Sequence, residues 1–163
     1  MSLIIPCRNE ENGIFEIIEE AKKYILFPYQ IVFVNDLSDD KTLNNMNLVK
    51  SRNPEINIKI INANGEGKSR AVDKGVVNSD GYFCAILDAD LTVKMKDVNL
   101  CYSAISIGNG DLINGSRLIY KLNKNSMRLL NFFGNKFFSI IISYITSSKV
   151  TDTLCGTKCF RKN

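Results

Sequence analysis

The sequence predicts one α/β domain in which a mainly parallel sheet is covered by helices on both faces. Short apolar runs alternate along the chain with segments of helical spacing, which is the pattern of strands joined by crossover helices. The composition is that of a globular protein, with 45% hydrophobic and 23% charged residues. A length of 163 residues is enough for one domain with a substantial core. Because no repeat, linker or low-complexity tract divides the chain, we expect a single domain over residues 1–163.

Strands are expected where a short apolar run ends at proline, glycine, asparagine or aspartate. The first such run ends at Pro6, and the fourth leads directly into Asp88. In chain order, the expected strands lie at residues 2–5, 30–34, 58–61, 82–87 and 112–113.

Helices are expected between these strands. The first can be capped by Asn9 or Asn12, and its apolar positions recur at helical spacing, at Ile14, Ile17, Ile18, Ala21 and Ile25. A polar helix is expected to end at about Arg52. Two more helices are expected, one after Gly67 and one around residues 98–107.

Polar loops follow three of the expected strands. In a Rossmann-like parallel sheet the ligand lies beyond the carboxyl ends of the strands. That rule brings residues 6–10, 35–40 and 88–92 to one edge of the sheet. We therefore expect the functional site at this edge.

The residue types exclude several kinds of chemistry. The chain has no histidine, which removes every Ser-His or Cys-His catalytic scheme. Its five cysteines are scattered, so we expect reduced thiols in a cytoplasmic protein. Cys155 and Cys159 are the one close pair, and without histidine or a second pair they argue against zinc. Carboxylates, cations and a metal ion are left to carry any reaction.

The charge is distributed unevenly. Nine of the 21 Lys and Arg residues lie after residue 115, whereas Asp152 is the one acidic residue there among 17. A basic segment of this kind indicates an anionic partner: nucleic acid, a phosphate group or a membrane surface. Since the sequence contains no RNA-binding module or zinc finger, we expect no nucleic acid as partner.

The stretch Gly65–Ser69 resembles a phosphate-binding loop but does not match either common pattern. A P-loop requires glycine at the position of Asn62, and a dinucleotide-binding fingerprint requires it at Arg70. One interpretation is a glycine-rich turn that enters a helix. The other is that Gly67 allows close approach of the backbone, with Lys68 or Arg70 near a phosphate.

The stretch ILDADLT, residues 86–92, allows two interpretations beyond a solvated strand end. A phosphatase of the haloacid-dehalogenase type needs a later acidic pair, but the acids after Thr92 are isolated: Asp97, Asp111 and Asp152. A site for a divalent cation requires fewer acidic residues, because Mg²⁺ or Mn²⁺ takes one or two carboxylates and completes its shell with water and phosphate. Asp88 and Asp90, two apart on an extended strand end, point the same way.

Six stretches are informative when they are taken together and in order: IIPCRNEEN, VNDLSDDKT, NGEGKSRAVDKG, ILDADLT, NGSRL and TDTLCGTKCFRK. Together they resemble the family 2 glycosyltransferases of the GT-A fold, in particular the dolichyl- and polyprenyl-phosphate mannose or glucose synthases. The similarity covers almost the whole chain. It implies a metal-dependent transferase that uses a UDP- or GDP-type sugar.

The resemblance also implies site residues. The nucleotide-sugar set is Pro6, Arg8, Glu10, Val34, Asp36, Lys68, Asp88 and Ala89. The metal set is Asp88, Asp90 and Thr92, with Mg²⁺ or Mn²⁺ as cofactor. The catalytic set is Arg117, which would meet a donor or acceptor phosphate, and Asp152, which falls near the acceptor.

The sequence departs from the family pattern at several positions. Arg8 stands where these synthases usually carry Tyr, and Asn35, Leu37 and Lys41 replace an Asp and two Gly residues. Asn35 keeps a hydrogen-bonding side chain but lacks the charge of that Asp, so it is expected to be a weaker partner for the base. Family members also usually continue beyond the point that corresponds to Asn163, so we expect a truncated chain.

The resemblance implies that the sugar is transferred with inversion to a polyprenyl phosphate. One alternative is a soluble or glycan acceptor with Asp152 as general base. Another is a truncated domain that binds nucleotide without turnover. The sequence leaves the sugar, the base and the oligomeric state open, with a homo-oligomer among the allowed states.

The apolar stretch at residues 129–145 bears on the membrane. Asn131, Asn135 and Lys136 interrupt it, which leaves fewer than the roughly 20 apolar residues that span a bilayer. It is expected to form either a core helix that covers the sheet or an interfacial helix on anionic lipid. The second alternative places the protein at the cytoplasmic face of a membrane.

Overall fold

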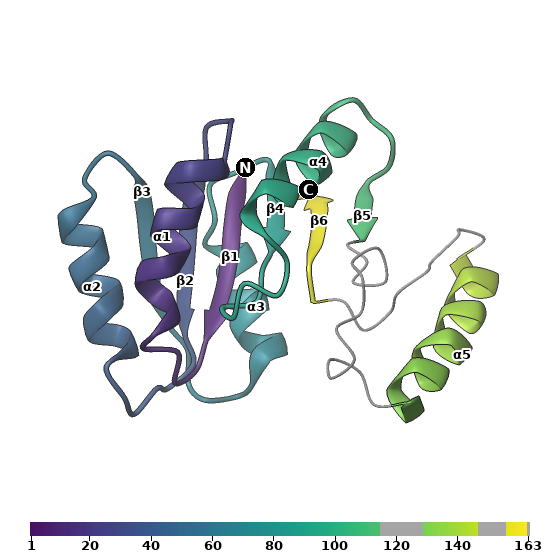
Figure 1. The fold of residues 1–163 in the computed structure, drawn as a ribbon, viewed down its shortest axis with the longest axis horizontal. Coiled ribbons are helices and arrows are strands. Elements are labelled where there is room, and N and C mark those ends of the chain that lie inside the picture. The colour runs from purple at the N-terminus through teal and green to yellow at the C-terminus, as the bar shows by residue number, and fades with distance from the viewer. Residues whose placement is uncertain (115–128, 147–155, 163) are drawn as a thin grey trace.

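A computed structural model describes residues 1–114, 129–146 and 156–162, with backbone alone at residues 129–136 and 146. The described strands are β1 (Ser2–Cys7), β2 (Gln30–Asn35), β3 (Asn57–Asn62), β4 (Phe83–Ile86), β5 (Leu112–Asn114) and β6 (Lys158–Arg161). The described helices are α1 (Gly13–Tyr24), α2 (Thr42–Arg52), α3 (Lys68–Val77), α4 (Met95–Ser106) and α5 (Leu129–Thr146). The strands form one sheet in the order β3-β2-β1-β4-β6-β5 (Figure 1).

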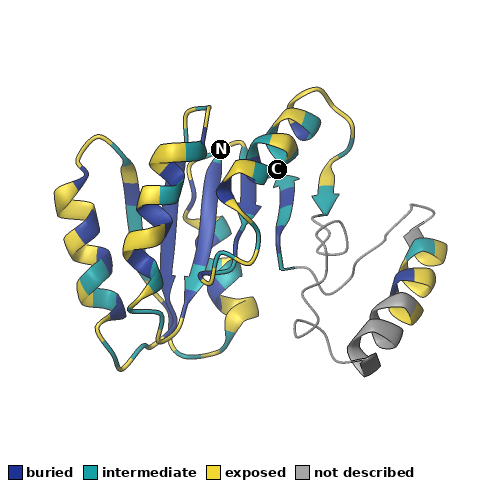
Figure 2. Ribbon diagram, in the orientation of Figure 1, coloured by how far each residue is buried: buried dark blue, intermediate teal, exposed yellow. Residues whose placement is uncertain are grey.

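Helices cover both faces of this sheet, as predicted. On one face, α1, α2 and α4 pack on alternate residues of β1 and β2, which include Leu3, Ile5 and Phe33. On the other face, α3 packs through Ala71 on a smaller cluster that includes Ile4. The central strands are buried on both faces (Figure 2), which is why they appear in the sequence as continuous apolar runs.

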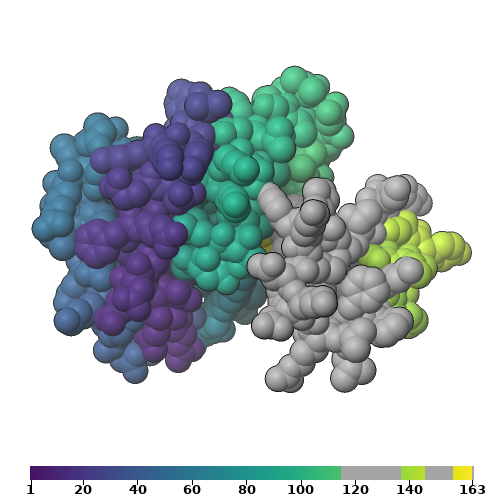
Figure 3. Space-filling model, viewed as in Figure 1, coloured from purple at the N-terminus to yellow at the C-terminus, as the bar shows by residue number. Residues whose placement is uncertain are grey.

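Helices α1 and α4 also contact each other on their shared face of the sheet. The Asn99 amide on α4 donates to the carbonyl of Tyr24 at 2.7 Å, and its oxygen accepts from the Leu26 N–H at 3.1 Å. In the space-filling view, these two segments form a continuous surface (Figure 3). These polar contacts join α4 to the C-terminal end of α1.

Strand β1 continues through Pro6, where the sequence analysis expected it to end. Ile4 accepts from the Leu87 N–H at 3.0 Å, so the hydrogen-bonding groups of Ile4 face β4. Pro6, two residues later, faces the same side, where the pairing with β4 has already ended. The missing N–H of proline therefore interrupts no ladder hydrogen bond, and β1 keeps its pairing with β2 through Cys7.

Strand β6 was not predicted from the sequence. It is antiparallel to both of its neighbours, with Ile86 of β4 opposite Lys158 and Asn114 of β5 opposite the same residue. The rest of the pairing is parallel, so the sheet is mainly parallel as expected. The antiparallel direction places the beginning of β6 beside the carboxyl end of β4.

Helix α5 lies apart from the sheet (Figures 1 and 2). Over residues 137–145, whose side chains are described, Phe137, Ile140 and Tyr144 are 63%, 63% and 87% exposed, whereas Ser139 is buried. A helix that covers the core would bury its large apolar residues instead. The core alternative is therefore not supported for these residues. Within the described part of the chain, no helix is long and apolar enough to cross a membrane.

Leu37, which stands in a family glycine position, has a φ of 57°. This left-handed conformation costs a branched side chain about 1–2 kcal/mol, and Leu37 recovers little by burial because it is 63% exposed. We expect Leu37→Gly to raise the free energy of unfolding by about 0.5–1 kcal/mol, since the entropy of glycine offsets part of the gain. Denaturant unfolding measures this difference.

Leu91→Gly is the matched control. Leu91 has a φ of 51° but is partly buried against the core. The same change there removes apolar contact and is expected to destabilise the protein. If Leu37→Gly destabilised it equally, backbone strain at residue 37 would be refuted.

Candidate active site

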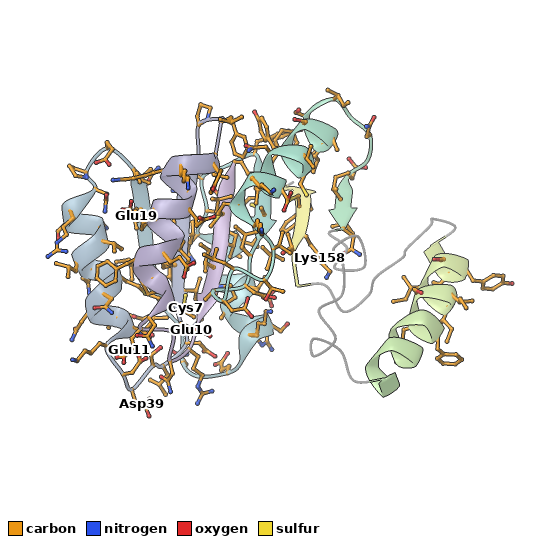
Figure 4. All side chains as sticks on the ribbon, viewed as in Figure 1. Cys7, Glu10, Glu11, Glu19, Asp39 and Lys158 are labelled. Carbon is orange, nitrogen blue, oxygen red and sulfur yellow. The ribbon has the colours of Figure 1, made fainter. Side chains whose placement is uncertain are left out.

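The carboxyl ends of β1, β2 and β4 meet at one edge of the sheet, because these strands are parallel neighbours. A pocket of about 390 Å³ opens there. It is lined by Pro6, Cys7, Arg8, Glu10, Asp36, Gly67, Lys68, Asp88, Ala89 and Asp90. Figure 4 shows Cys7 and Glu10 at this end of the sheet. The three loops that the sequence placed together therefore do form one cavity.

Asp36 is the buried acid of the pocket, with 2% exposure. Its backbone N–H donates to the carbonyl of Cys7 at 2.9 Å, which continues the β1–β2 ladder by one step. Its Oδ2 accepts from the N–H of Gly67 at 3.1 Å. Its Oδ1 is buried and has no hydrogen-bond partner among the described residues. Because a buried carboxylate oxygen without a donor is costly, this atom is a natural acceptor for an N–H of a ligand.

Asp88 and Asp90 stand just beyond β4. The Leu87 N–H still pairs with β1. The N–H of Leu91 then donates to the carbonyl of Asp88 at 3.2 Å, which turns the chain after the pair. Asp90 Oδ1 accepts from both the backbone N–H and the hydroxyl of Thr92, at 3.0 and 2.5 Å. These contacts fix the direction of the Asp90 carboxylate.

The Asp88 carboxylate has one ionic partner and one close neighbour. The ammonium of Lys68 pairs with its Oδ1. On another side lies Gly156, at which a Cβ would overlap the Asp88 carboxylate oxygens. Any side chain at position 156 would therefore displace the Asp88 carboxylate.

The pocket has an acidic character that extends to Glu10. Burial raises the pKa of Glu10 above its ordinary value, and the neighbouring carboxylates Asp90, Asp40 and Asp88 raise it further. A group of carboxylates that repel one another in this way favours a bound cation. In the described residues, no three metal-ligating side chains form a cluster. Asp88 and Asp90 nevertheless supply the oxygen ligands that suit Mg²⁺ or Mn²⁺, which takes its other ligands from water and phosphate.

The loop after β1 is fixed to the loop after β2 by hydrogen bonds. The Glu10 N–H donates to the Thr42 hydroxyl at 2.8 Å, and the Asp39 N–H donates to the Asn9 side chain at 3.1 Å. Asn35 accepts from the Ser38 N–H at 3.2 Å. Asn35 thus uses its side chain inside the turn, although it lacks the charge of the Asp usual in the family.

The predicted site residues fall into three groups. Eight line the pocket: Pro6, Arg8, Glu10, Asp36, Lys68, Asp88, Ala89 and Asp90. Two do not: Thr92 is exposed beside Asp90, and Val34 is fully buried in the cluster that packs against α3. Arg117 and Asp152 lie outside the described residues. The roles assigned to all of them stay predictions.

Sequence reasoning missed two residues that shape this site. Cys7 lines the pocket, and burial raises the pKa of its thiol, which keeps it protonated. Gly156 lies against Asp88. Gly67, which the sequence analysis expected near a phosphate, also lines the pocket. The glycine of the stretch TDTLCGTKCFRK was a usable signal, because a glycine between polar residues often marks close approach of a backbone. Its partner in space could not be read from the sequence.

The sheet and its acidic pocket beyond β1, β2 and β4 define an α/β domain of the GT-A type, a class of sugar-transferring enzymes. The chain belongs to glycosyl transferase family 2, whose model matches residues 2–163. The family resemblance predicted from the six stretches is thereby confirmed, as is the fold.

The chain is similar in sequence to enzymes that act on lipid phosphates. It is 28% identical over 181 residues to a dolichyl-phosphate β-glucosyltransferase of Dictyostelium discoideum, a match that covers 99% of this chain and 54% of the relative. It is 26% identical over 165 residues to a dodecaprenyl-phosphate galacturonate synthase of Rhizobium johnstonii, with 99% and 47% covered. The chain thus spans about half the length of these curated relatives.

Solved structures show the same fold. One is glucosyl-3-phosphoglycerate synthase from Mycobacterium tuberculosis with Mn²⁺, UDP and glucosyl-3-phosphoglycerate, with a TM-score of 0.74 and 14% identity over 99% of this chain and 56% of that one. Another is a mannosyltransferase from Pyrobaculum calidifontis with GDP-mannose and Mn²⁺, with a TM-score of 0.70 and 15% identity over 98% and 44%. At these identities the likeness concerns the fold.

Proposed function

We propose that this chain is the donor-binding and catalytic part of a transferase that moves a sugar from a nucleoside diphosphate to a polyprenyl phosphate. The observation that carries the proposal is the pocket that joins the buried acceptor oxygen of Asp36 to the strand-end pair Asp88 and Asp90. The relatives named for dolichyl and dodecaprenyl phosphate support the lipid acceptor.

The nucleoside end of the donor would bind at Asp36. Its free Oδ1 accepts a hydrogen bond, so it favours a base with a ring N–H, which uracil and guanine have and cytosine lacks. The similar structures contain UDP or GDP-mannose, in agreement with a UDP- or GDP-type donor. Pro6 and Arg8 line the same cavity and would border the nucleotide.

The diphosphate end would lie at Asp88 and Asp90, which would hold Mg²⁺ or Mn²⁺. When bound, such a cation stabilises the negative charge that develops on the leaving diphosphate. Both similar structures contain Mn²⁺. Thr92 holds Asp90 in place through two hydrogen bonds, so we assign it a positioning role.

The transfer itself would break one bond and form one. An oxygen of the lipid phosphate attacks the anomeric carbon from the side opposite the nucleotide. The bond from that carbon to the β-phosphate oxygen breaks, and the nucleoside diphosphate leaves with the electron pair. The product has inverted configuration. A phosphate acceptor is already an anion, so it requires cations such as Arg117 rather than a general base at Asp152.

Helix α5 would bring the domain to the lipid. Its described apolar side chains are exposed, with Phe137 and Phe138 at 63% and 53%. Basic residues precede it in the sequence, among them Lys121, Lys124 and Arg128, outside the described residues. An apolar helix beside basic residues favours the interface of an anionic membrane.

Sedimentation with vesicles that contain a polyprenyl phosphate tests this proposal. We expect binding to increase with anionic lipid and to decrease with salt. Each basic residue near such a surface contributes about 1 kcal/mol. Reversing Lys121 and Lys124 to Glu removes two such contributions and should therefore weaken vesicle binding at least about 30-fold, while nucleotide affinity stays unchanged.

The matched control reverses Lys50 and Arg52, which are exposed at the end of α2. This variant has the same net charge and should bind vesicles like the unchanged protein. Equal losses in both variants would show a general charge effect. A protein that stays in the supernatant with every vesicle would refute the lipid acceptor.

A further inference from the structure

Lys68 connects the two halves of the pocket. It is the first residue of α3 and follows Gly67, whose N–H is bound by Asp36. The backbone at the start of α3 is thus fixed at the nucleoside end of the pocket. The Lys68 side chain reaches to the other end, where its ammonium pairs with Asp88 Oδ1.

The two partners in this ion pair differ in exposure. The Asp88 side chain is 22% exposed and lies close to Gly156, whereas the Lys68 side chain is 57% exposed. A lysine side chain has four rotatable bonds and no fixed geometry. Because the Lys68 side chain is more than half exposed, its ammonium can be hydrated when it leaves Asp88. Lys68 can therefore exchange Asp88 for another anion in the pocket.

The charges around the pocket give the ammonium two alternative partners. The lining contains the four acids Glu10, Asp36, Asp88 and Asp90, and two cations, Arg8 and Lys68. A divalent cation at Asp88 and Asp90 would repel an ammonium on the same carboxylate. A diphosphate in the same cavity would attract that ammonium instead.

We propose that Lys68 is an exchangeable counter-ion: it neutralises Asp88 in the free protein and moves to the donor diphosphate when a divalent cation takes the carboxylate. This inference rests on the proposed function. Lys68 then opposes the cation when no nucleotide is present and assists binding when nucleotide is present. Metal and nucleotide affinities are therefore coupled through this side chain, and the coupling is reciprocal.

The test is Mn²⁺ binding to Lys68→Met, measured by electron paramagnetic resonance with and without UDP or GDP. Methionine keeps much of the length of lysine and removes its charge. We expect the variant without nucleotide to bind Mn²⁺ about fivefold more tightly than the unchanged protein, within the usual range of coupling between sites. We also expect the nucleotide to enhance Mn²⁺ binding less in the variant.

Two further variants separate this role from a general charge effect. Lys68→Arg restores a cation at Asp88 and should restore weak Mn²⁺ binding. Lys74→Met removes the same charge from α3 at a separate hollow, which it lines with Arg70 and Val77. It should bind Mn²⁺ like the unchanged protein.

The outcomes distinguish this inference from the proposed function. If the unchanged protein binds Mn²⁺ with nucleotide and Lys68→Met leaves nucleotide-free affinity the same, Lys68 is a fixed structural partner and the inference is wrong. If the unchanged protein binds no Mn²⁺ with or without nucleotide, the proposed metal site is itself wrong. A gain of Mn²⁺ affinity in both Lys68→Met and Lys74→Met would also overturn the specific role.

Discussion

Replacing Asp90 by asparagine is expected to weaken metal-dependent binding of UDP or GDP about 100-fold, about 2.7 kcal/mol. The change removes the charge that would bind a divalent cation but preserves the shape of the side chain. The amide oxygen can still accept from the N–H and hydroxyl of Thr92, so the turn after β4 should remain folded. The loss would therefore report on the cation rather than on the loop.

Calorimetric titration with Mn²⁺ and then with EDTA measures this effect. Asp73→Asn is the matched control, because Asp73 is exposed on α3 and lines a hollow separate from the pocket. The control should bind like the unchanged protein. Equal nucleotide affinity with Mn²⁺ and with EDTA, in the unchanged protein, would contradict a metal at Asp88 and Asp90.

The first four strands and helices could be predicted from the sequence because each carries its own local pattern. The four predicted apolar positions that fall within α1 are all buried: Ile14, Ile17, Ile18 and Ala21. Strand β2 is buried along its whole length and appears as the run Gln30–Asn35. Burial on both faces of a parallel sheet produces such runs. The predicted ends of these elements differ from the observed ends by only a few residues.

Strand β6 could not be predicted in the same way. Its four residues, Lys158–Arg161, include two basic residues and no long apolar run. Its place in the sheet depends on pairing with β4, more than 70 residues earlier in the chain. Pairing over such a separation leaves no local signal in the sequence.

The site residues that lie at the ends of strands could be predicted from the sequence. Asp36 and Asp88 come directly after apolar runs, and the rule that parallel strands end at one edge brings them into one pocket. Contacts across the pocket were not predictable. The ion pair from Lys68 to Asp88 joins the start of α3 to the loop after β4, and the closeness of Gly156 to Asp88 depends on the unpredicted strand β6.

Replacing Asp36 by asparagine is expected to weaken UDP and GDP binding roughly 10- to 100-fold, since a hydrogen bond to a charged group contributes about 1.5–3 kcal/mol. The Gly67 N–H donates to Oδ2 of Asp36, so the amide oxygen of asparagine should remain there. The amide NH₂ then takes the position of the unpartnered Oδ1 and faces the base with a donor instead of an acceptor. A base with a ring N–H is repelled, whereas the ring nitrogen of cytosine can accept.

Calorimetry with four ligands, each with Mn²⁺, checks this prediction. The variant should bind UDP and GDP more weakly than the unchanged protein. Its affinity for CDP should fall less or should rise, and its affinity for pyrophosphate should be unchanged because pyrophosphate does not reach Asp36. Asp39→Asn is the matched control, since Asp39 is exposed on the same loop (Figure 4) and does not line the pocket. If pyrophosphate lost as much affinity as UDP, Asp36 would act by holding the start of α3 through Gly67 rather than by binding the base.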